Sequence, residues 1–222
     1  MQPRRSQPGS EAITAPELSR VERRKKNTRR RILAAAEQLM RSRPVDSVTI
    51  QDITAAADVG HGSFYLHFKT KYDVLVPIVQ AMAARTDGQL RQILAGTDDP
   101  ALVIAVSARV VGRQIVGDEL WRWLLQHSGV PVEELRRAVG TYVERDFRTG
   151  FASGRISAPD PMVVATYAFG GFVNCVLAAM NHDRPEEQID QGVELTLRVF
   201  GLTPEEARQL AHQPLPELEL ES

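Results

Sequence analysis

The side chains best suited to chemistry lie in the stretch TIQDITAAADVGHGSFYLHFKTKYDVL, residues 49–75. It places hydroxyl, amide, imidazole and ammonium groups around an almost uncharged run, GSFYLHF. An isolated apolar run normally enters a protein core. Here polar groups are interleaved with the aromatic rings and lysines follow at once, so we expect one side of the run to be buried and the other to be offered to an external partner.

No pattern in the sequence predicts catalysis. The five histidines are scattered over several predicted elements, and the sole cysteine, Cys175, lies in an apolar segment. Metal-ligand spacing, a glycine-rich phosphate loop and a nucleophile motif are all missing from the sequence. We therefore predict no catalytic residue, no metal ligand and no cofactor, and an enzyme is the less favoured alternative.

Positive charge is concentrated at the N-terminal end. Residues 1–72 contain 14 Lys and Arg against 7 Asp and Glu, whereas residues 73–222 contain 13 against 21. Arg29, Arg30 and Arg31 fall in the first turn of a predicted helix, where positive charge opposes the helix dipole. This asymmetry indicates that the N-terminal end meets a polyanion such as a nucleic acid. A solvated basic face is the alternative interpretation.

One long apolar segment needs a membrane test. Residues 162–180 carry no charge over 19 positions, which is long enough in principle to span a bilayer. The segment contains polar and glycine positions and lacks flanking basic clusters and aromatic belts. We therefore expect a buried helix of a soluble, cytoplasmic protein that has no membrane partner. With one cysteine, no disulfide can form within the chain.

The elements that position these residues are predicted to be helices throughout. Capping-box spacing at Thr49–Asp52 and Thr70–Asp73, an N-cap at Asp160 and the sequence Thr203-Pro204 mark helix starts. No segment shows sustained two-residue alternation with turn chemistry, so we predict no sheet. The predicted helices cover residues 27–43, 49–57, 61–68, 70–84 with a bend at Pro77, 100–116, 118–127, 131–153, 161–181 and 185–200, followed by a short terminal helix.

Residues 49–68 fit a helix-turn-helix. The first helix is followed by a turn at Asp58-Val59-Gly60, and the second helix buries Phe64 and Phe68, which lie four residues apart and so on one face. The remaining side chains of the second helix then point away from this small core. A helix of this width fits the DNA major groove. The outward side chains are those of His61, Ser63, Tyr65, Leu66 and His67.

This region resembles the N-terminal DNA-binding domain of the TetR family of bacterial transcriptional regulators. The shared pattern is T-I-x-D-I, a three-residue turn, G-[small]-F-Y-x-H-F and K-x-K with an acid two residues later, preceded by TRRRILAAAEQLM. The match is close over residues 27–75, and beyond them only helix number and order agree. The resemblance implies an all-α protein of about nine to ten helices. Its parts would be a disordered N-terminal arm (1–22), a three-helix helix-turn-helix DNA-binding domain (23–72), a larger helical effector-binding and dimerisation domain (73–212) and a flexible acidic tail (213–222).

The resemblance implies roles for individual residues in binding double-stranded DNA. Thr49, Tyr65 and Lys71 would contact phosphate oxygens, and phosphate contacts position a protein on the duplex. The residues nearest the bases would be Gln51, His61, Ser63 and Leu66, whose contacts specify the sequence. Arg29, in the first turn of the basic helix, would also bind DNA, and His67 would either contact phosphate or pack and hydrogen-bond locally. Two positions depart from the family pattern, because Asp58 replaces a usual Gly and Gly60 replaces a common Ser or Thr cap.

The resemblance further implies a homodimer and a cavity for a small-molecule effector. Two stripes of residues at helical spacing would form the dimer interface, although both could pack within one chain: Gly171, Cys175 and Ala179, and Ile189, Val193, Leu197 and Phe200. Aromatic and polar side chains of the middle helices would line the cavity, although each alone is more typical of a core position: Trp121, Trp123, Phe147, Phe151, Tyr167, Phe172 and Asn174.

The function that the sequence favours is a sequence-specific transcriptional regulator, a ligand-responsive repressor that binds a palindromic operator as a homodimer. An activator and a nonspecific architectural DNA-binding protein are the alternatives. The operator, the regulated genes and the effector do not follow from the residues.

Overall fold

The computed structural model describes residues 19–126 and 132–216. Over these ranges the chain is helical and contains no strand, which confirms the all-α prediction. The α-helices in chain order are α1 (Arg20–Ser42), α2 (Ile50–Ala56), α3 (His61–Tyr65), α4 (Leu75–Ile93), α5 (Pro100–Gly117), α6 (Glu119–Gln126), α7 (Val132–Ala152), α8 (Pro161–Ala179), α9 (Pro185–Val199) and α10 (Pro204–His212). Two 3₁₀ turns, η1 (Val45–Ser47) and η2 (Lys71–Val74), connect α1 to α2 and α3 to α4.

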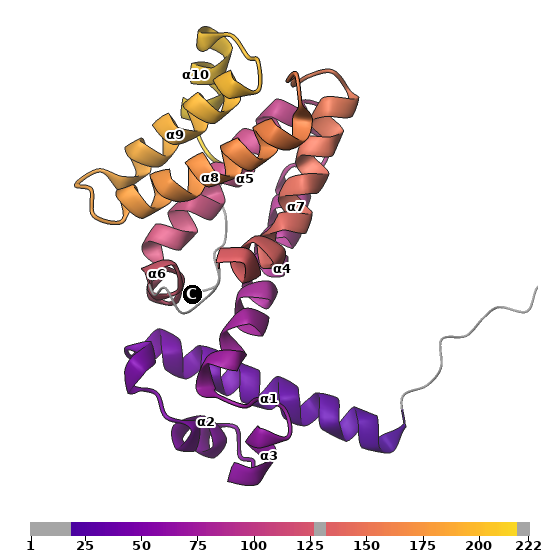
Figure 1. Cartoon of the computed structure of the whole chain (residues 1–222), viewed down its shortest axis with the longest axis vertical. Coiled ribbons are helices and arrows are strands. Elements are labelled where there is room, and N and C mark those ends of the chain that lie inside the picture. Colours follow the sequence, from indigo (N-terminus) through magenta and orange to yellow (C-terminus); the bar gives the residue numbers. More distant parts are fainter. Residues whose placement is uncertain (1–18, 127–131, 217–222) are drawn as a thin grey trace, which may run out of the picture.

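The helices form a small N-terminal unit and a larger body. Figure 1 shows α1, α2 and α3 at the lower end of the molecule, with α4 rising from them toward α5 to α10. α1 packs against α2, α3, α4 and α6, so it lies between the helix-turn-helix and the body. The N-terminal unit is therefore held by the long α1 and by α4.

The predicted helix starts are confirmed by hydrogen bonds. Capping boxes form at Thr49–Asp52, Thr70–Asp73 and Thr203–Glu206, and the Asp160 carboxylate accepts from the first backbone N–H groups of α8. Each device satisfies backbone donors that a helix start leaves free. Asp58 occupies the left-handed region with φ of 48°, so it replaces the usual glycine in the turn between α2 and α3.

The boundaries of α1 and α4 differ from the prediction. α1 begins at Arg20 through a capping box at Ser19, so residues 20–22, which we predicted to be disordered, are helical. Residues 1–18 of the predicted arm lie outside the described residues. The helix predicted from Thr70 is split into η2 and α4, which puts Pro77 in the first turn of α4, where no backbone N–H is needed. α4 then runs to Ile93, well past the predicted end at residue 84.

The N-terminal unit shares its hydrophobic core with the body. Ile32, Ile53 and Phe64 of the unit belong to one buried cluster with Leu120 and Trp121 of α6. A close-packed interior has low compressibility, so a displacement of one helix is passed on to the helices packed against it. A movement of α6 is therefore expected to displace α1, and α1 is expected to displace α3.

Two of the three apolar clusters of the described chain lie mainly in the body. One of them joins α5, α8, α9 and α10. α9 packs closely on both α5 and α8 because glycines face the partner helices. A Cβ atom added at Gly112 would lie 2.9 Å from Ile189 Cγ2, and one added at Gly192 would lie 3.0 Å from Cys175 Sγ. Gly112 and Gly192 thus allow close approach of helices within one chain, whereas a Cβ atom at Gly171 would meet nothing within 4 Å.

Candidate DNA-binding surface and internal cavity

The second helix of the helix-turn-helix is anchored by phenylalanine and exposed on its other side. Phe64 is fully buried and its ring lies 5.6 Å from that of Phe68 between centroids. Tyr65 is 52% exposed and Leu66 75% exposed. α3 is shorter than predicted, because it ends at Tyr65 and residues 67 and 68 continue as a turn bonded to the Phe64 carbonyl. Gly60 gives no side-chain cap, as its residue type predicts.

The other predicted DNA contacts surround this helix. Thr49, Gln51, His61 and Arg29 are exposed, whereas Ser63 and His67 are half-buried. Thr49 Oγ1 already donates to Asp52 Oδ2 at 2.7 Å, so it would approach a phosphate as part of its capping box. The His61 and Tyr65 rings meet edge to face, with their centroids 5.4 Å apart. The exposed side of α2 and α3 thus carries neutral hydrogen-bonding groups next to an apolar side chain.

His67 lies in a positively charged neighbourhood. Burial lowers the pKa of the His67 imidazole, and the charges of Lys25 and Arg29 lower it further. The Arg29 guanidinium also stands 5.2 Å from the centroid of the Phe68 ring. His67 is therefore neutral at pH 7, and the positive charge beside it is carried by the side chains of α1.

Lys71 occupies a position that departs from its predicted role. Its ammonium donates to the backbone carbonyls of Val45, Asp46 and Val48 at 3.2, 2.8 and 2.9 Å. These carbonyls belong to the connection between α1 and α2, where the Val45 carbonyl also accepts the Val48 N–H at 3.2 Å. An ammonium has three N–H donors, and all three are used here. Lys71 therefore links the α1–α2 connection to η2, the turn that precedes α4. Its three N–H groups are all used, so none is left for a phosphate.

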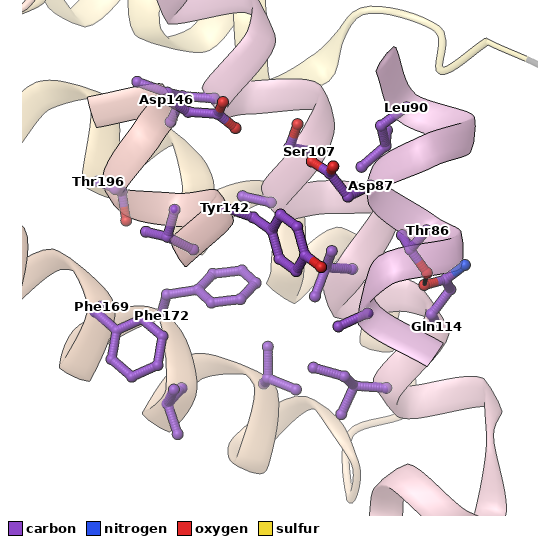
Figure 2. A pocket seen from close by; sticks show the side chains of 18 of the residues that line it. Thr86, Asp87, Leu90, Ser107, Gln114, Tyr142, Asp146, Phe169, Phe172 and Thr196 are labelled. Atoms are coloured by element: carbon purple, nitrogen blue, oxygen red, sulfur yellow. Dashed lines mark hydrogen bonds between the residues drawn. The ribbon is translucent and has the colours of Figure 1, made fainter. Parts of the chain in front are cut away.

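An internal cavity of about 140 Å³ lies within the body. Its walls come from α4, α5, α6, α7, α8 and α9, and they are mostly aliphatic and aromatic. Figure 2 shows the Tyr142 ring projecting into this space, with Phe169 and Phe172 on one side and Asp87, Thr86 and Gln114 on the other. The cavity is therefore apolar with a few polar groups at its edge, the usual composition of a small-molecule site.

The polar edge of the cavity is built on two carboxylates. Arg145 Nη2 donates to Asp87 Oδ1 at 2.8 Å, and Arg145 Nε donates to Asp146 Oδ1 at 2.9 Å. Asp87 Oδ2 also lies 2.7 Å from Arg91 Nη2. Burial raises the pKa of Asp146, and the neighbouring Asp87 charge raises it further, while Arg145 and Arg91 oppose both effects. Both carboxylates line the cavity whereas neither arginine does, so the wall presents acceptors to a ligand.

The aromatic residues predicted to line the cavity divide into two groups. Trp121, Phe147 and Phe172 are in its wall, whereas Trp123, Phe151, Tyr167 and Asn174 are not. Sequence reasoning missed Asp87, Tyr142 and Asp146. A signal for Asp87 existed, because it follows Ala83 by four residues on the buried face of α4, where an unpaired acid is not expected.

The four residues outside the cavity have identifiable neighbours. Trp123 faces away from the cavity, where Nε1 donates to Asp46 Oδ2 at 3.2 Å and the indole stacks on Tyr72 with centroids 5.9 Å apart. Phe151 packs edge-on against Phe200, and Asn174 Nδ2 donates to the Gly170 carbonyl. Tyr167 is 68% exposed. α6 thus contributes Trp121 to the cavity wall and Trp123 to a contact with the N-terminal unit.

The residues predicted to form a dimer interface are mostly buried within one chain. Ile189, Val193, Leu197 and Phe200 face α5, α8 and α10, and Ala179 is also fully buried. Only Gly171 is exposed, and Cys175 is half-buried against Gly192. The prediction selected the inner faces of both helices, because burial within a chain and burial between chains leave the same periodic stripe. The outer face of α8 and α9 instead exposes Met162, Val163, Tyr167, Leu195 and Val199.

Both α5 and α8 are long and apolar enough to cross a membrane by length and composition. In the structure 44% of the apolar stretch of α5 is buried, against 17% of that of α8. No group of three His, Cys, Asp or Glu side chains that could hold a metal ion occurs in the described ranges.

Most of the chain matches family models of known proteins. Residues 32–77 match the family model of bacterial regulatory proteins of the tetR family, and residues 99–213 match the tetracyclin repressor-like C-terminal domain. The crystal structure of RolR in complex with resorcinol is 31% identical to the chain with a TM-score of 0.78, and it covers 88% of this chain and 98% of RolR.

More distant structures share the fold. SmeT, the repressor of the Stenotrophomonas maltophilia multidrug efflux pump SmeDEF, is 22% identical with a TM-score of 0.59, over 86% of this chain and 100% of SmeT. Thermus thermophilus FadR with lauroyl-CoA is 18% identical with a TM-score of 0.65, over 85% and 99%. A sequence search of curated proteins found no match. From the two family models and the likeness to RolR, the chain belongs to the TetR family of bacterial regulatory proteins, whose members are ligand-responsive DNA-binding repressors.

Proposed function

We propose that this chain is a homodimer that binds a palindromic operator through α2 and α3 and leaves it when a small hydroxylated aromatic compound occupies the cavity. The main support for DNA binding is the exposure of α3. Its Phe64 is fully buried, while Tyr65 and Leu66 are exposed on the opposite side. Gln51 has the amide needed for bidentate contact with adenine, and Leu66 suits a thymine methyl. Because its partner is DNA, the protein would act in the cytoplasm.

Removing the Tyr65 hydroxyl is expected to weaken operator binding without unfolding the protein. Tyr65→Phe deletes one hydrogen bond to a charged phosphate, which corresponds to about 1.5–3 kcal/mol, or roughly tenfold to 150-fold in affinity. Fluorescence-anisotropy titration with a duplex selected from a random-sequence pool measures the change, with a scrambled duplex as competitor. Unchanged affinity would remove Tyr65 from the contacts, and wild-type binding that scrambled DNA abolishes would contradict a sequence-specific regulator.

The proposed effector class rests on the size and edge of the cavity. An apolar cavity of about 150 Å³ accommodates a benzene molecule, and the volume here is about 140 Å³. Asp87 and Asp146 place carboxylate oxygens at its wall, which suits a ligand whose hydroxyls donate hydrogen bonds. The similar protein RolR was crystallised in complex with resorcinol, a benzene ring with two hydroxyl groups. These features support a single aromatic ring with hydroxyl substituents.

Resorcinol is expected to release the protein from its operator, and 1,3-dimethoxybenzene, which has no donor, is not. Asp146→Leu should raise the resorcinol concentration needed for half-release by about tenfold or more, since hydrogen bonds to charged groups contribute about 1.5–3 kcal/mol. Glu144→Leu is the matched control, because Glu144 is exposed on the same helix and outside the cavity. Equal responses of the two variants would exclude Asp146 from ligand binding.

The homodimer is proposed to form through the outer face of α8 and α9. Val163 and Tyr167 are four residues apart on α8, and Leu195 and Val199 have the same spacing on the adjacent α9. An apolar face of this kind on a DNA-binding protein suits a two-fold partner, which would place two α3 helices on half-sites about 34–36 Å apart or at a multiple of that distance.

Leu195→Asp is expected to convert the protein to a monomer by burying a charge in that interface. Sedimentation equilibrium would then report a mass near 24.6 kDa for the variant and twice that for the wild type. Arg208→Asp, an exposed position on α10, should leave the dimer intact. A monomeric wild type that still binds one operator tightly would contradict the proposal.

A further inference from the structure

The first turns of α1 form a basic segment that the protein's own packing does not explain. Residues 20–26, RVERRKK, carry five positive charges and one negative charge, and every one of them is exposed. They precede residue 32, where the match to the N-terminal family model begins. We call residues 20–26 the basic extension of α1. Nothing assigned to the helix-turn-helix or to the cavity involves it.

The basic extension is an unfavourable helix on its own. Like charges three and four residues apart repel each other, and positive charge at a helix N-terminus opposes the dipole. No side chain between residues 20 and 27 is buried, so packing does not compensate. Two local interactions stabilise it: the capping box of Ser19 and Glu22, and a 3.0 Å hydrogen bond from Arg30 to Asn27. An external polyanion would remove the repulsion.

The extension lies beside the recognition surface. Figure 1 shows the N-terminal end of α1, in indigo, running past α3 at the same end of the molecule. Arg29 stands over the Phe68 ring, and the charges of Lys25 and Arg29 both act on His67, which follows α3 in sequence. At 1.5 Å per residue, α1 reaches about 13 Å beyond Arg29 at Arg20.

The lysines and arginines of the extension do not share one face. At about 100° per residue, Lys25 and Lys26 lie within roughly 60° of Arg29 around the helix axis. Arg20 and Arg24 lie roughly 140–180° from Arg29. Lys25 and Lys26 therefore lie on the same face of α1 as Arg29. Arg20 and Arg24 lie on the opposite face.

We propose that Lys25 and Lys26 bind backbone phosphates of the DNA that flanks the bases contacted by α3. The contact would be independent of sequence, because it uses charge alone and two flexible ammonium groups. The inference rests on the proposed DNA-binding function, which supplies the duplex. It extends that function by adding a phosphate-binding surface outside the helix-turn-helix, and it makes the protein's affinity depend on the length of the duplex beyond the half-site.

Two double variants test this inference. Lys25→Gln with Lys26→Gln removes the proposed contacts, and Arg20→Gln with Arg24→Gln removes the same charge from the other face of the same helix. Glutamine has nearly the helix propensity of lysine and arginine, so α1 is preserved, which circular dichroism checks. Each protein is titrated with the selected duplex and with a scrambled duplex at several salt concentrations, each duplex in a long form and a form trimmed to the half-sites.

The lysine variant is expected to reduce the slope of log affinity against log salt by about 4 on long duplexes, because the proposed dimer carries both lysines on each protomer and each phosphate contact contributes about 0.9. The same reduction is expected on the scrambled duplex, and trimming should lower wild-type affinity to that of the variant, by about tenfold near 0.1 M salt. The arginine variant should change the slope by less than about 1. Equal effects of the two variants, or wild-type affinity that trimming does not change, would overturn the inference. Loss of preference for the selected duplex with the slope change intact would instead count against the proposed function alone.

Discussion

Replacing Asp190 with alanine is expected to lower the free energy of unfolding by about 3–5 kcal/mol, the usual cost of removing one partner of a buried ion pair. Asp190 lies on α9 and is 7% exposed, and Arg109 on α5 is 3% exposed. Arg109 Nε and Nη2 donate to the two carboxylate oxygens at 2.8 and 3.0 Å. Arg113 donates to the same carboxylate at 3.0 Å. One acid therefore holds two guanidinium groups between α5 and α9.

The same network reaches the end of the described chain. Arg109 Nη1 donates to the Gln213 carbonyl at 2.7 Å, which ties the segment after α10 to α5. Leu215 in turn packs with Leu90 and Val110. Residues 213–216, the first part of the predicted flexible tail, are therefore anchored, while residues 217–222 lie outside the described residues. Loss of Asp190 would leave a buried cation and loosen this end as well.

Thermal and urea unfolding measure the Asp190→Ala effect. A loss of this size corresponds to roughly 6–20 °C in a protein of about this length. Glu186→Ala is the matched control, because Glu186 pairs with Arg113 at 2.8 Å but is an exposed partner, whose removal usually changes stability by less than about 1 kcal/mol. The double variant Arg109→Met with Asp190→Leu should recover most of the loss, since apolar replacement of a buried pair is often neutral. A change below about 1 kcal/mol in Asp190→Ala would show that the pair is not the fastening between α5 and α9.

The helix-turn-helix could be read from the sequence because its signals are local. Phe64 and Phe68 lie on one face at a spacing of four, Thr49 and Asp52 form a capping box within four residues, and Asp58 adopts the left-handed conformation of the turn. Each feature involves residues close together in the chain. Local hydrogen bonding and periodicity fix such elements before any long-range packing is known.

The cavity and the ion-pair network could not be read in this way. Asp87 meets Arg145 across 58 positions, and Arg109 meets Asp190 across 81. Arg109 and Arg113 share one face of α5, and only the fold shows that this face meets the Asp190 carboxylate. A helical stripe also does not say whether another helix of the same chain or a partner covers it. The residues of α9 that we had assigned to the dimer consequently proved to be core.

Lys71→Met is expected to destabilise the N-terminal unit rather than simply weaken a phosphate contact. The Lys71 ammonium satisfies the carbonyls of Val45, Asp46 and Val48, two of which belong to partly buried hydrogen bonds. Methionine keeps most of the aliphatic stem but removes the Lys71 donor from all three carbonyls, of which Val45 keeps the Val48 N–H as a partner. Hydrogen bonds to a charged group contribute about 1.5–3 kcal/mol, so the melting temperature should fall by roughly 3–12 °C. Operator affinity should fall with it, because the connection from α1 to α2 positions Thr49.

Lys69→Met separates this role from the predicted phosphate contact. Lys69 is exposed, two residues away, and its replacement removes the same charge from the same region. If Lys71 is a clamp, only Lys71→Met lowers the melting temperature, and its DNA affinity recovers at temperatures well below the transition. If Lys71 is instead a phosphate ligand, the melting temperature stays unchanged and the salt slope of DNA binding falls by about 1 for each protomer, or about 2 for the dimer, at every temperature. The three short distances to backbone carbonyls favour the clamp, because binding a phosphate would require the ammonium to give up donors that no other group of that connection replaces.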